Sequence, residues 1–251
     1  MNAPEHTLRL LALYPEQMNI YADRGNIIFF ERRCAWRGIE FELTRCGLGE
    51  GFDPTAHDLI YMGGGQDRDQ RVVASDLVAT KREGLARAKG EGAVILAVCG
   101  GYQLLGSSYQ LADEEIEGLG LVDLKTVREP GPRLIGPVAI TVDLDGTPRT
   151  VAGFENHGGR TYLGPGAKPL GKVESGHGNN GGDGFEGVTE DNLFGTYLHG
   201  PLLPKNAWLA DHLIELALAH HHGGPVELEP LDDEFEAAAH RAARDAALSS
   251  R

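Results

Sequence analysis

The chain lacks several features that would place it in whole classes of protein. Its three cysteines, Cys34, Cys46 and Cys99, form no CxxC pair and leave no even-numbered set for a disulfide framework. Basic residues are not in excess, because 23 Lys and Arg stand against 37 Asp and Glu. The resulting net charge of −14 disfavours a general role in binding nucleic acid phosphates. No Walker A pattern is present, so ATP binding by a P-loop is not expected.

Long hydrophobic runs are also missing. The apolar stretch at residues 8–13 is interrupted by Arg9 and is too short for a signal-peptide core or a membrane span. No basic segment precedes it. The sequence therefore predicts a cytoplasmic protein without membrane insertion. Its 251 residues, 41% of them hydrophobic, suffice for a sizeable buried core.

Glycine, by contrast, is abundant, with 35 residues that cluster at 63–65, 100–101, 158–159 and 181–182. Such clusters are typical of tight turns at functional sites, where a side chain would block close approach. The glycine-rich segment 171–184 is expected to be a surface hairpin or a mobile loop.

Strand-like and helix-like segments alternate along the chain. This alternation predicts one α/β domain with a mainly parallel sheet flanked by helices. We assign residues 1–225 to this domain and 226–251 to a C-terminal helical extension. Strands are expected at 8–14, 39–44, 58–62, 93–98, 135–142, 150–154 and 192–198, and helices at 26–38, 72–89, from 101 onward, at 207–222 and at 232–248.

The sharpest local signal is the segment AVCGGYQLLG at residues 97–106. An apolar strand ends, a cysteine occupies the turn, and a helix begins, which is the layout of a nucleophile elbow. Gly100 and Gly101 leave space for a strained turn and for substrate. The helix start favours the Cys99 thiolate, and the Gly100 N–H can face a developing oxyanion. We therefore interpret Cys99 as a nucleophile, and Cys34 and Cys46 as structural thiols.

A thiol nucleophile needs a base, and ten histidines compete for that role. His199 follows a predicted strand, and catalytic groups gather at the carboxyl ends of strands in such sheets. His157 is a second candidate. The run His220 to His222 is better explained by a solvated helix end than by a metal site, and no metal site is expected. The glycines at 63–65 follow another buried strand and are positioned to offer a second oxyanion donor.

Five segments stand out when the chain is taken as a whole: LYPEQMNIYADRGN (13–26), YMGGGQD (61–67), AVCGGYQLLG (97–106), ENHGGRT (155–161) and GTYLHGP (195–201). Together they resemble the class I glutamine amidotransferases, in the branch related to cobyric acid synthase. Within this branch the chain is similar to the glutaminase subunits of lipid II isoglutaminyl synthases, because it has their N-terminal motif and lacks a fused ATP-binding domain.

The resemblance implies a role for particular residues. Cys99 attacks the glutamine side-chain amide to form a thioester, and His199 moves the proton. Gly64 and Gly100 form the oxyanion hole. Arg133 binds the α-carboxylate of glutamine, with Arg128 as a nearby competitor. Gln103 is also expected to bind substrate.

One position departs from the family pattern. Most class I enzymes have a glutamate two residues after the catalytic histidine, where this chain has Pro201. Either a Cys–His dyad suffices or another acid orients His199, and we hypothesise that a partner supplies it. The resemblance implies a heterodimer with a Mur-ligase-like (MurT-like) subunit that binds ATP and Mg, with no cofactor in this chain. That partner is expected to use the ammonia to amidate D-glutamate of the peptidoglycan stem peptide. The alternatives are a glutaminase that supplies another acceptor, such as a cobyrinate-type corrinoid, or a non-catalytic scaffold.

Overall fold

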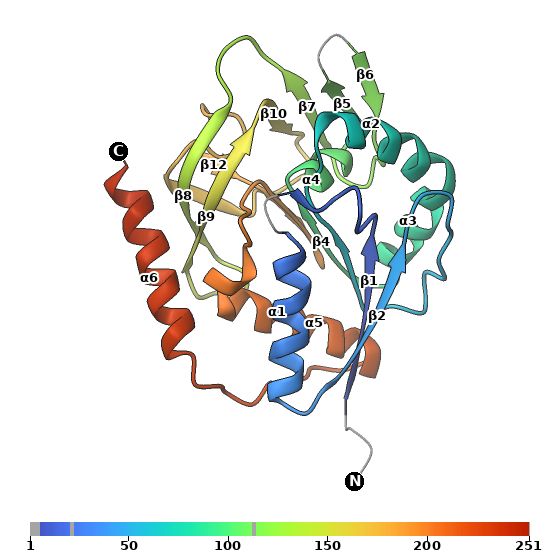
Figure 1. Cartoon of the computed structure of the whole chain (residues 1–251), viewed down its shortest axis with the longest axis vertical. Coiled ribbons are helices and arrows are strands. Elements are labelled where there is room, and N and C mark those ends of the chain that lie inside the picture. The colour runs from blue at the N-terminus through green and yellow to red at the C-terminus, as the bar shows by residue number, and fades with distance from the viewer. Residues whose placement is uncertain (1–5, 21–22, 112–113, 251) are drawn as a thin grey trace.

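The central element is a six-stranded sheet with the order β13–β14–β4–β3–β1–β2 (Figure 1). The computed structural model describes residues 6–20, 23–111 and 114–250. Every neighbouring pair in this sheet is parallel except β13 with β14. The strands are β1 (Thr7–Leu13), β2 (Glu40–Cys46), β3 (Leu59–Met62), β4 (Val94–Val98), β13 (Val188–Glu190) and β14 (Leu193–Thr196).

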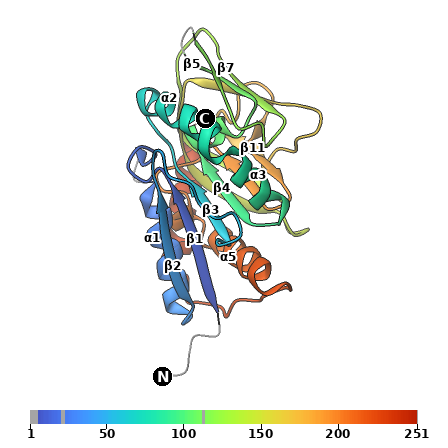
Figure 2. The same ribbon diagram turned by 90° about the vertical axis from the view of Figure 1, so that its right-hand side faces the viewer.

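Helices cover both faces of this sheet. The crossover from β1 to β2 and the crossover from β3 to β4 run in opposite directions, so right-handed connections place their helices on opposite faces. Figure 2 shows α1 and α3 on either side of the strands. Strands β3 and β4 are buried along their whole length, as expected for strands covered on both faces. The helical segments are α1 (Arg24–Trp36), α2 (Asp67–Asp76), the π-helical turn η2 (Leu77–Lys81), α3 (Arg82–Gly90), α4 (Gly100–Leu104), the 3₁₀ turn η3 (Leu203–Lys205) and α5 (Ala207–His222).

Two smaller sheets lie beside the central one. One has the order β10–β7–β5–β6 and the other β12–β11–β8–β9. Both pair mostly antiparallel strands, and only β5 with β7 is parallel. Their strands are β5 (Ser108–Leu111), β6 (Glu114–Glu117), β7 (Leu124–Arg128), β8 (Leu134–Val142), β9 (Arg149–His157), β10 (Gly159–Leu163), β11 (Gly171–Ser175) and β12 (Phe185–Glu186).

The last helix, α6 (Glu234–Ser249), packs outside the second small sheet, against β8 and β9 (Figure 1). Salt bridges connect the segment just before α6 to helices α1 and α5. Arg33 of α1 is fully buried and forms salt bridges with Asp211 of α5 and with Asp233. The helix expected at 232–248 is therefore present, and a buried charge cluster lies at its start.

The expected α/β architecture is confirmed, and the differences lie in the details. The helix expected at 72–89 begins at Asp67 and contains a π-helical turn. Residues 171–184 belong to a hairpin, because β11 pairs with β12. In α1, Ile27 and Phe30 are buried, whereas Ile28 and Trp36 are exposed. The four-stranded sheet that contains β5, β6, β7 and β10 was not predicted. None of the described helices is long and apolar enough to cross a membrane.

Candidate active site

Cys99 lies in a sharp turn between β4 and α4. Its backbone has φ 52° and ψ −106°, a conformation that is rare for a residue with a side chain. The turn is held because the Cys99 N–H donates to the Thr196 carbonyl of the neighbouring strand at 2.8 Å. Strain maintained by the surrounding sheet is typical of a nucleophile elbow. Helix α4 has only five residues, so its local N–H groups, not a long macrodipole, are what the sulfur meets.

His199 reaches the same edge of the sheet from β14. Val98 and Thr196 are register partners on neighbouring parallel strands, so the segments beyond them leave the sheet side by side. His199 comes three residues after β14, and its backbone pairs with Phe154 of β9 through N···O distances of 3.0 and 3.3 Å. The side chain is fully buried. His199 therefore follows β14, and Cys99 follows the neighbouring strand β4, at the same edge of the sheet.

The electrostatic environment keeps His199 neutral. Burial, followed by the charges of His157, Lys205 and Arg133, lowers the pKa of its imidazole to about 4. At neutral pH the ring therefore has a lone pair with which to accept a proton. This is the state that a general base for a thiol requires.

The rival base His157 has other contacts. It lies at the end of β9, and its Nδ1 lies 2.8 Å from the Gly159 carbonyl, so that nitrogen carries the hydrogen. Its ring stacks on Tyr197 with a centroid distance of 3.5 Å. Its Nε2 is 3.7 Å from the buried carboxylate of Glu155. These contacts describe a packed ring beside the site, and they favour His199 as the base.

The glycine loop after β3 lies directly against the nucleophile. A Cβ placed on Gly64 would lie 3.1 Å from the Cβ of Cys99 and 2.7 Å from Ile20 Cγ2, so no side chain fits there. In this structure the Gly64 N–H donates to Asp23 Oδ2 at 2.8 Å. The Gly63 carbonyl accepts from the Gly101 N–H at 3.1 Å. The oxyanion role of Gly64 and Gly100 stays a prediction, and the Gly64 N–H is engaged by a carboxylate in this conformation.

Two arginines meet near Gly158. Arg133 donates through Nε and Nη2 to the Asn156 side-chain oxygen and carbonyl, both at 2.8 Å, and remains exposed. A Cβ on Gly158 would lie 1.6 Å from Arg128 Nη1 and 3.3 Å from Arg133 Nη1. The two guanidinium groups are therefore neighbours. Arg133 and Arg128 both remain candidates for binding a carboxylate.

Gln103, predicted to bind substrate, is buried in an internal network. Its Nε2 donates to the Tyr197 hydroxyl at 3.1 Å, and its Oε1 accepts from Gln70 Nε2 at 3.4 Å. Gln70 also donates to the Gly65 carbonyl. Through these bonds Gln103 connects the glycine loop to the segment that leads to His199. A substrate contact by Gln103 stays a prediction.

Sequence reasoning did not single out two buried acids near the site. Glu186 accepts from the Tyr197 N–H at 2.6 Å and from the Thr196 hydroxyl, and burial raises its pKa to about 8. Asp23, within the quoted N-terminal motif, is fully buried. Residues 21 and 22 of that motif lie outside the described residues. For Asp23 the available signal was its position inside the N-terminal motif, whereas Glu186 lies in none of the five quoted segments.

The remaining thiols and the histidine run are remote from Cys99: Cys46 ends β2, three strands along the sheet from β4, and Cys34 lies in α1. Burial raises the pKa of Cys34 to about 12 and also raises the pKa of Cys46, which makes both poor nucleophiles. His220 and His221 approach the buried carboxylate of Asp58 at 3.5 and 3.3 Å. Within the described part of the chain, no cluster of three His, Cys, Asp or Glu side chains is arranged to hold a metal.

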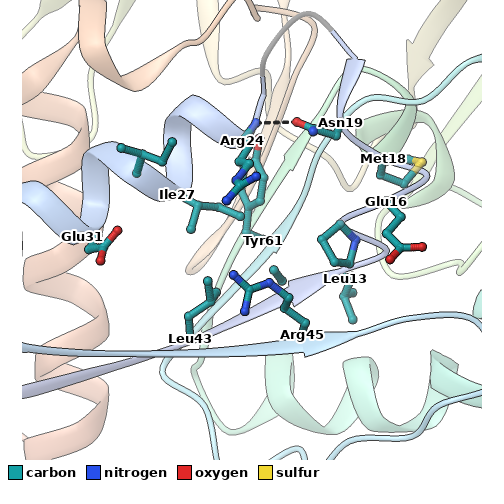
Figure 3. Close-up of a pocket in the computed structure, with 13 residues that line it drawn as sticks. Leu13, Glu16, Met18, Asn19, Arg24, Ile27, Glu31, Leu43, Arg45 and Tyr61 are labelled. Atoms are coloured by element: carbon teal, nitrogen blue, oxygen red, sulfur yellow. Dashed lines mark hydrogen bonds between the residues drawn. The ribbon is translucent and has the colours of Figure 1, made fainter.

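A cavity of about 250 Å³ lies between α1 and the ends of β1 and β2 (Figure 3). Arg24 and Arg45 extend into it in Figure 3, and Met18 and Tyr61 form part of its wall. The Asn19 side-chain oxygen accepts from the Arg24 N–H at 2.8 Å. The cavity is separate from the Cys99 elbow but shares Met18 and Tyr61 with the surroundings of the loop.

A strained cysteine after a buried parallel strand, a neutral histidine after the adjacent strand and a glycine loop after the strand on the other side define the class of site. It is the thiol site of a class I glutamine amidotransferase. The sequence matches the model of the CobB/CobQ-like glutamine amidotransferase domain over residues 9–207. The chain belongs to this family, and it is a glutamine amidotransferase.

Curated relatives agree with this assignment. The chain is 39% identical over 230 residues to the lipid II isoglutaminyl synthase (glutamine-hydrolyzing) subunit GatD of Streptococcus pneumoniae, covering 91% of this chain and 87% of that one. It is 40% identical over 232 residues to the subunit of the same name from Staphylococcus aureus, covering 92% of each. A probable cobyric acid synthase of Methanothermobacter thermautotrophicus is more distant, at 32% over 184 residues, with 66% of this chain and 35% of that protein covered.

Solved structures share the fold. The structure of PurLQS from Thermotoga maritima matches with a TM-score of 0.54 and 19% identity, covering 84% of this chain and 95% of that chain. A ThuA-like protein from Bacteroides uniformis matches with a TM-score of 0.51 and 10% identity, covering 90% and 96%. At these identities the likeness shows the architecture alone.

Proposed function

We propose that this chain is the glutaminase subunit of a lipid II isoglutaminyl synthase and that Cys99 and His199 release ammonia from glutamine. The observation that carries the proposal is the placement of the Cys99 elbow and of neutral His199 after neighbouring parallel strands. Identity of about 40% to two GatD subunits over nine-tenths of the chain supports the same activity.

In the first half of the reaction, the Cys99 sulfur attacks the side-chain amide carbon of glutamine. His199 takes the thiol proton as the S–C bond forms and the carbonyl oxygen becomes an oxyanion. His199 then returns this proton to the amide nitrogen, the C–N bond breaks, and ammonia leaves. A γ-glutamyl thioester remains on Cys99.

In the second half, water attacks the thioester carbon and His199 accepts its proton. The C–S bond breaks, the thiolate recovers a proton from His199, and glutamate leaves. Backbone N–H groups from the glycine loop and from the start of α4 are suited to stabilise the oxyanion in both halves. Arg133 is the proposed partner of the substrate α-carboxylate, with Arg128 beside it.

The acceptor assignment rests on the named relatives. We propose that the ammonia passes to a Mur-ligase-like (MurT-like) partner, which binds ATP and Mg and amidates D-glutamate of the lipid II stem peptide. The proposed complex is a heterodimer. Because Pro201 replaces the usual acid, the partner is also proposed to contribute the group that orients His199. A cobyrinate-type acceptor is the second candidate, supported only by the more distant similarity to cobyric acid synthase.

Ammonia release from glutamine tests the catalytic assignment. We expect Cys99→Ala and His199→Ala each to lose at least about a thousandfold in kcat, because the two residues act as one unit. Cys34→Ala is the matched control, since that thiol is buried in α1, and it should keep wild-type kcat. Arg133→Ala should raise KM more than it lowers kcat. Equal hydrolysis by Cys99→Ala and wild type would exclude the proposed function.

The acceptor needs a separate measurement. The chain should co-purify with a Mur-ligase-like protein, and the pair should convert lipid II to its amidated form with glutamine as nitrogen donor. Adding ammonia in place of glutamine should bypass Cys99→Ala. Amidation of a corrinoid substrate and not of lipid II would favour the second candidate.

A further inference from the structure

Asp23 has an unusual position for a helix-start residue. It occupies the N-cap position of α1, but its side chain forms no capping hydrogen bond with that helix. An Asp at this position ordinarily stabilises its own helix by about 1 kcal/mol through such a bond. Instead, Oδ2 accepts the Gly64 N–H at 2.8 Å. The carboxylate is therefore directed at the glycine loop beside Cys99.

The surroundings of Asp23 disfavour its negative charge. It is fully buried, and within the described part of the chain no salt bridge joins it to a Lys or Arg. Its Oδ1 is buried and has no hydrogen-bond partner among the described residues. Burial raises the pKa of Asp23 to about 7, although the N–H groups of Gly64 and Gly200 partly oppose this. Both ionisation states are thus accessible at physiological pH.

Asp23 also lies close to the nucleophile. Its Oδ2 and the Cys99 Cβ are each 3.1 Å from the position that a Cβ on Gly64 would take. The other titratable groups near it are Tyr61, whose hydroxyl donates to the Asp23 carbonyl, and His199 beyond Gly200. Lys205 donates to the carbonyl of Gly200, and Arg24 follows Asp23 at the start of α1.

The peptide unit between Gly63 and Gly64 is held at both ends. Its N–H donates to Asp23, and its C=O accepts from the Gly101 N–H at the start of α4. The carbonyl, not the N–H, therefore faces the side on which the oxyanion donors should be. A glycine on each side allows this peptide to rotate, because glycine tolerates the backbone angles of both orientations.

We propose that Asp23 is a positioning residue that sets the direction of the Gly63–Gly64 peptide and so controls the oxyanion hole of this amidotransferase. Ionised Asp23 accepts the Gly64 N–H and holds the peptide in the orientation described above. Protonated Asp23 donates to the Gly63 carbonyl after the peptide rotates by about half a turn. The Gly64 N–H then joins the N–H groups at the start of α4 and faces the oxyanion formed on Cys99.

The cavity between α1 and the ends of β1 and β2, which Met18 lines, is suited to this movement (Figure 3). A Cβ on Gly63 would lie 2.4 Å from the Met18 carbonyl, and one on Gly65 would lie 2.6 Å from Met18 Sδ. Met18 thus packs between the cavity and the loop. Displacement of this segment into the cavity would leave room for the peptide to turn without disturbing β3.

An asparagine at position 23 combines the hydrogen-bonding abilities of ionised and protonated Asp23. Its side-chain oxygen accepts and its side-chain nitrogen donates, with no change of protonation. The inference rests on the proposed glutaminase reaction and is tested by glutamine hydrolysis of the full chain from pH 6 to pH 8. The ratio of kcat for Asp23→Asn to kcat for wild type should rise by about tenfold over this range, as wild-type Asp23 loses its proton. For Asp58→Asn, a buried acid at the other end of β3, the same ratio should stay constant.

A second measurement does not depend on activity. The amide nitrogen and proton shifts of Gly64 should titrate with a midpoint near pH 7 in wild type and in Cys99→Ala, and should not titrate in Asp23→Asn. A constant kcat ratio in folded protein, or a Gly64 amide without a titration in wild type, would overturn the role of Asp23. Hydrolysis that survives Cys99→Ala would instead exclude the proposed function and leave the Gly64 titration to be judged by itself.

Discussion

Two buried carboxylates lie at opposite ends of β3 and have opposite environments. Asp58, directly before the strand, accepts from Arg9 through the backbone N–H, Nε and Nη2 at 3.0, 3.0 and 2.6 Å. Burial raises its pKa, but the hydrogen bonds and charge of Arg9 outweigh burial, and the pKa lies below its usual value. Asp23, beside the loop after the strand, has no such cation, and its pKa is raised to about 7.

The difference separates a structural acid from a functional one. A buried charge that is paired and fully hydrogen-bonded holds the elements that it joins in one arrangement. A buried acid with one unpartnered oxygen, next to a nucleophile, is held in an unfavourable state by the rest of the structure. The carboxyl ends of the parallel strands, where Asp23 lies, are also the edge at which ligands gather in this class of fold.

The largest expected effect is on the pH dependence of stability. The folded-state pKa of Asp23 is above the unfolded value, so its contribution is complete below about pH 4 and is lost as the pH rises to about 7. Between pH 4 and pH 8, wild type should lose roughly 2–4 kcal/mol more of its unfolding free energy than Asp23→Asn does. Urea denaturation at several pH values measures this. If the free energy of unfolding changed with pH in the same way for both proteins, the charge of Asp23 would not destabilise the folded state.

A smaller effect is expected when the pair at the other end is broken. Arg9→Met leaves Asp58 buried without its cation and should lower the free energy of unfolding at pH 7 by about 2 kcal/mol. The Arg9 side chain is 27% exposed, and this limits the loss. Glutamine hydrolysis at saturating substrate should stay within about twofold of wild type, because the change lies at the far end of β3. A large fall in kcat would show that the Asp58 end of β3 does affect the active site at its other end.

The third prediction concerns the titration midpoints of the buried carboxyl groups in the folded wild-type protein. Carboxyl carbon shifts should titrate near pH 7 for Asp23, whereas the pKa of Asp58 should lie below the usual value for an aspartate. Glu186, also buried and without a salt bridge among the described residues, should titrate near pH 8. The matched control is Asp53, an exposed acid whose pKa is lowered by hydrogen bonds from Thr55. A midpoint for Asp23 near that of Asp53 would remove the contrast.

The central sheet and the elbow could be predicted because their signals are local. The short strand expected at 58–62 runs directly into Gly63, and the wholly apolar segment 93–98, which indicated a buried parallel strand, is followed by Cys99 and two glycines. The position of Cys99 followed from this pattern. His199 also lies at the expected edge, although two residues separate it from the end of β14.

The parts that were not predicted depend on tertiary contacts. Strands β5, β6 and β7 have four, four and five residues and mix polar with apolar positions, so periodicity does not identify them. The engagement of Gly64 by Asp23 joins residues 41 positions apart. Nothing in the local pattern distinguishes Asp23 from an ordinary helix cap, because its burial is created by β3 and by the turn after His199.

The buried Arg33 has a consequence for how the position of α1 is fixed. In the described part of the chain its salt bridges are with Asp211 and Asp233, which lie 178 and 200 residues further along. Complete pairing of the Arg33 charge therefore requires both α5 and the residue just before α6 to be in place. The final position of α1 thus depends on segments that lie far along the chain.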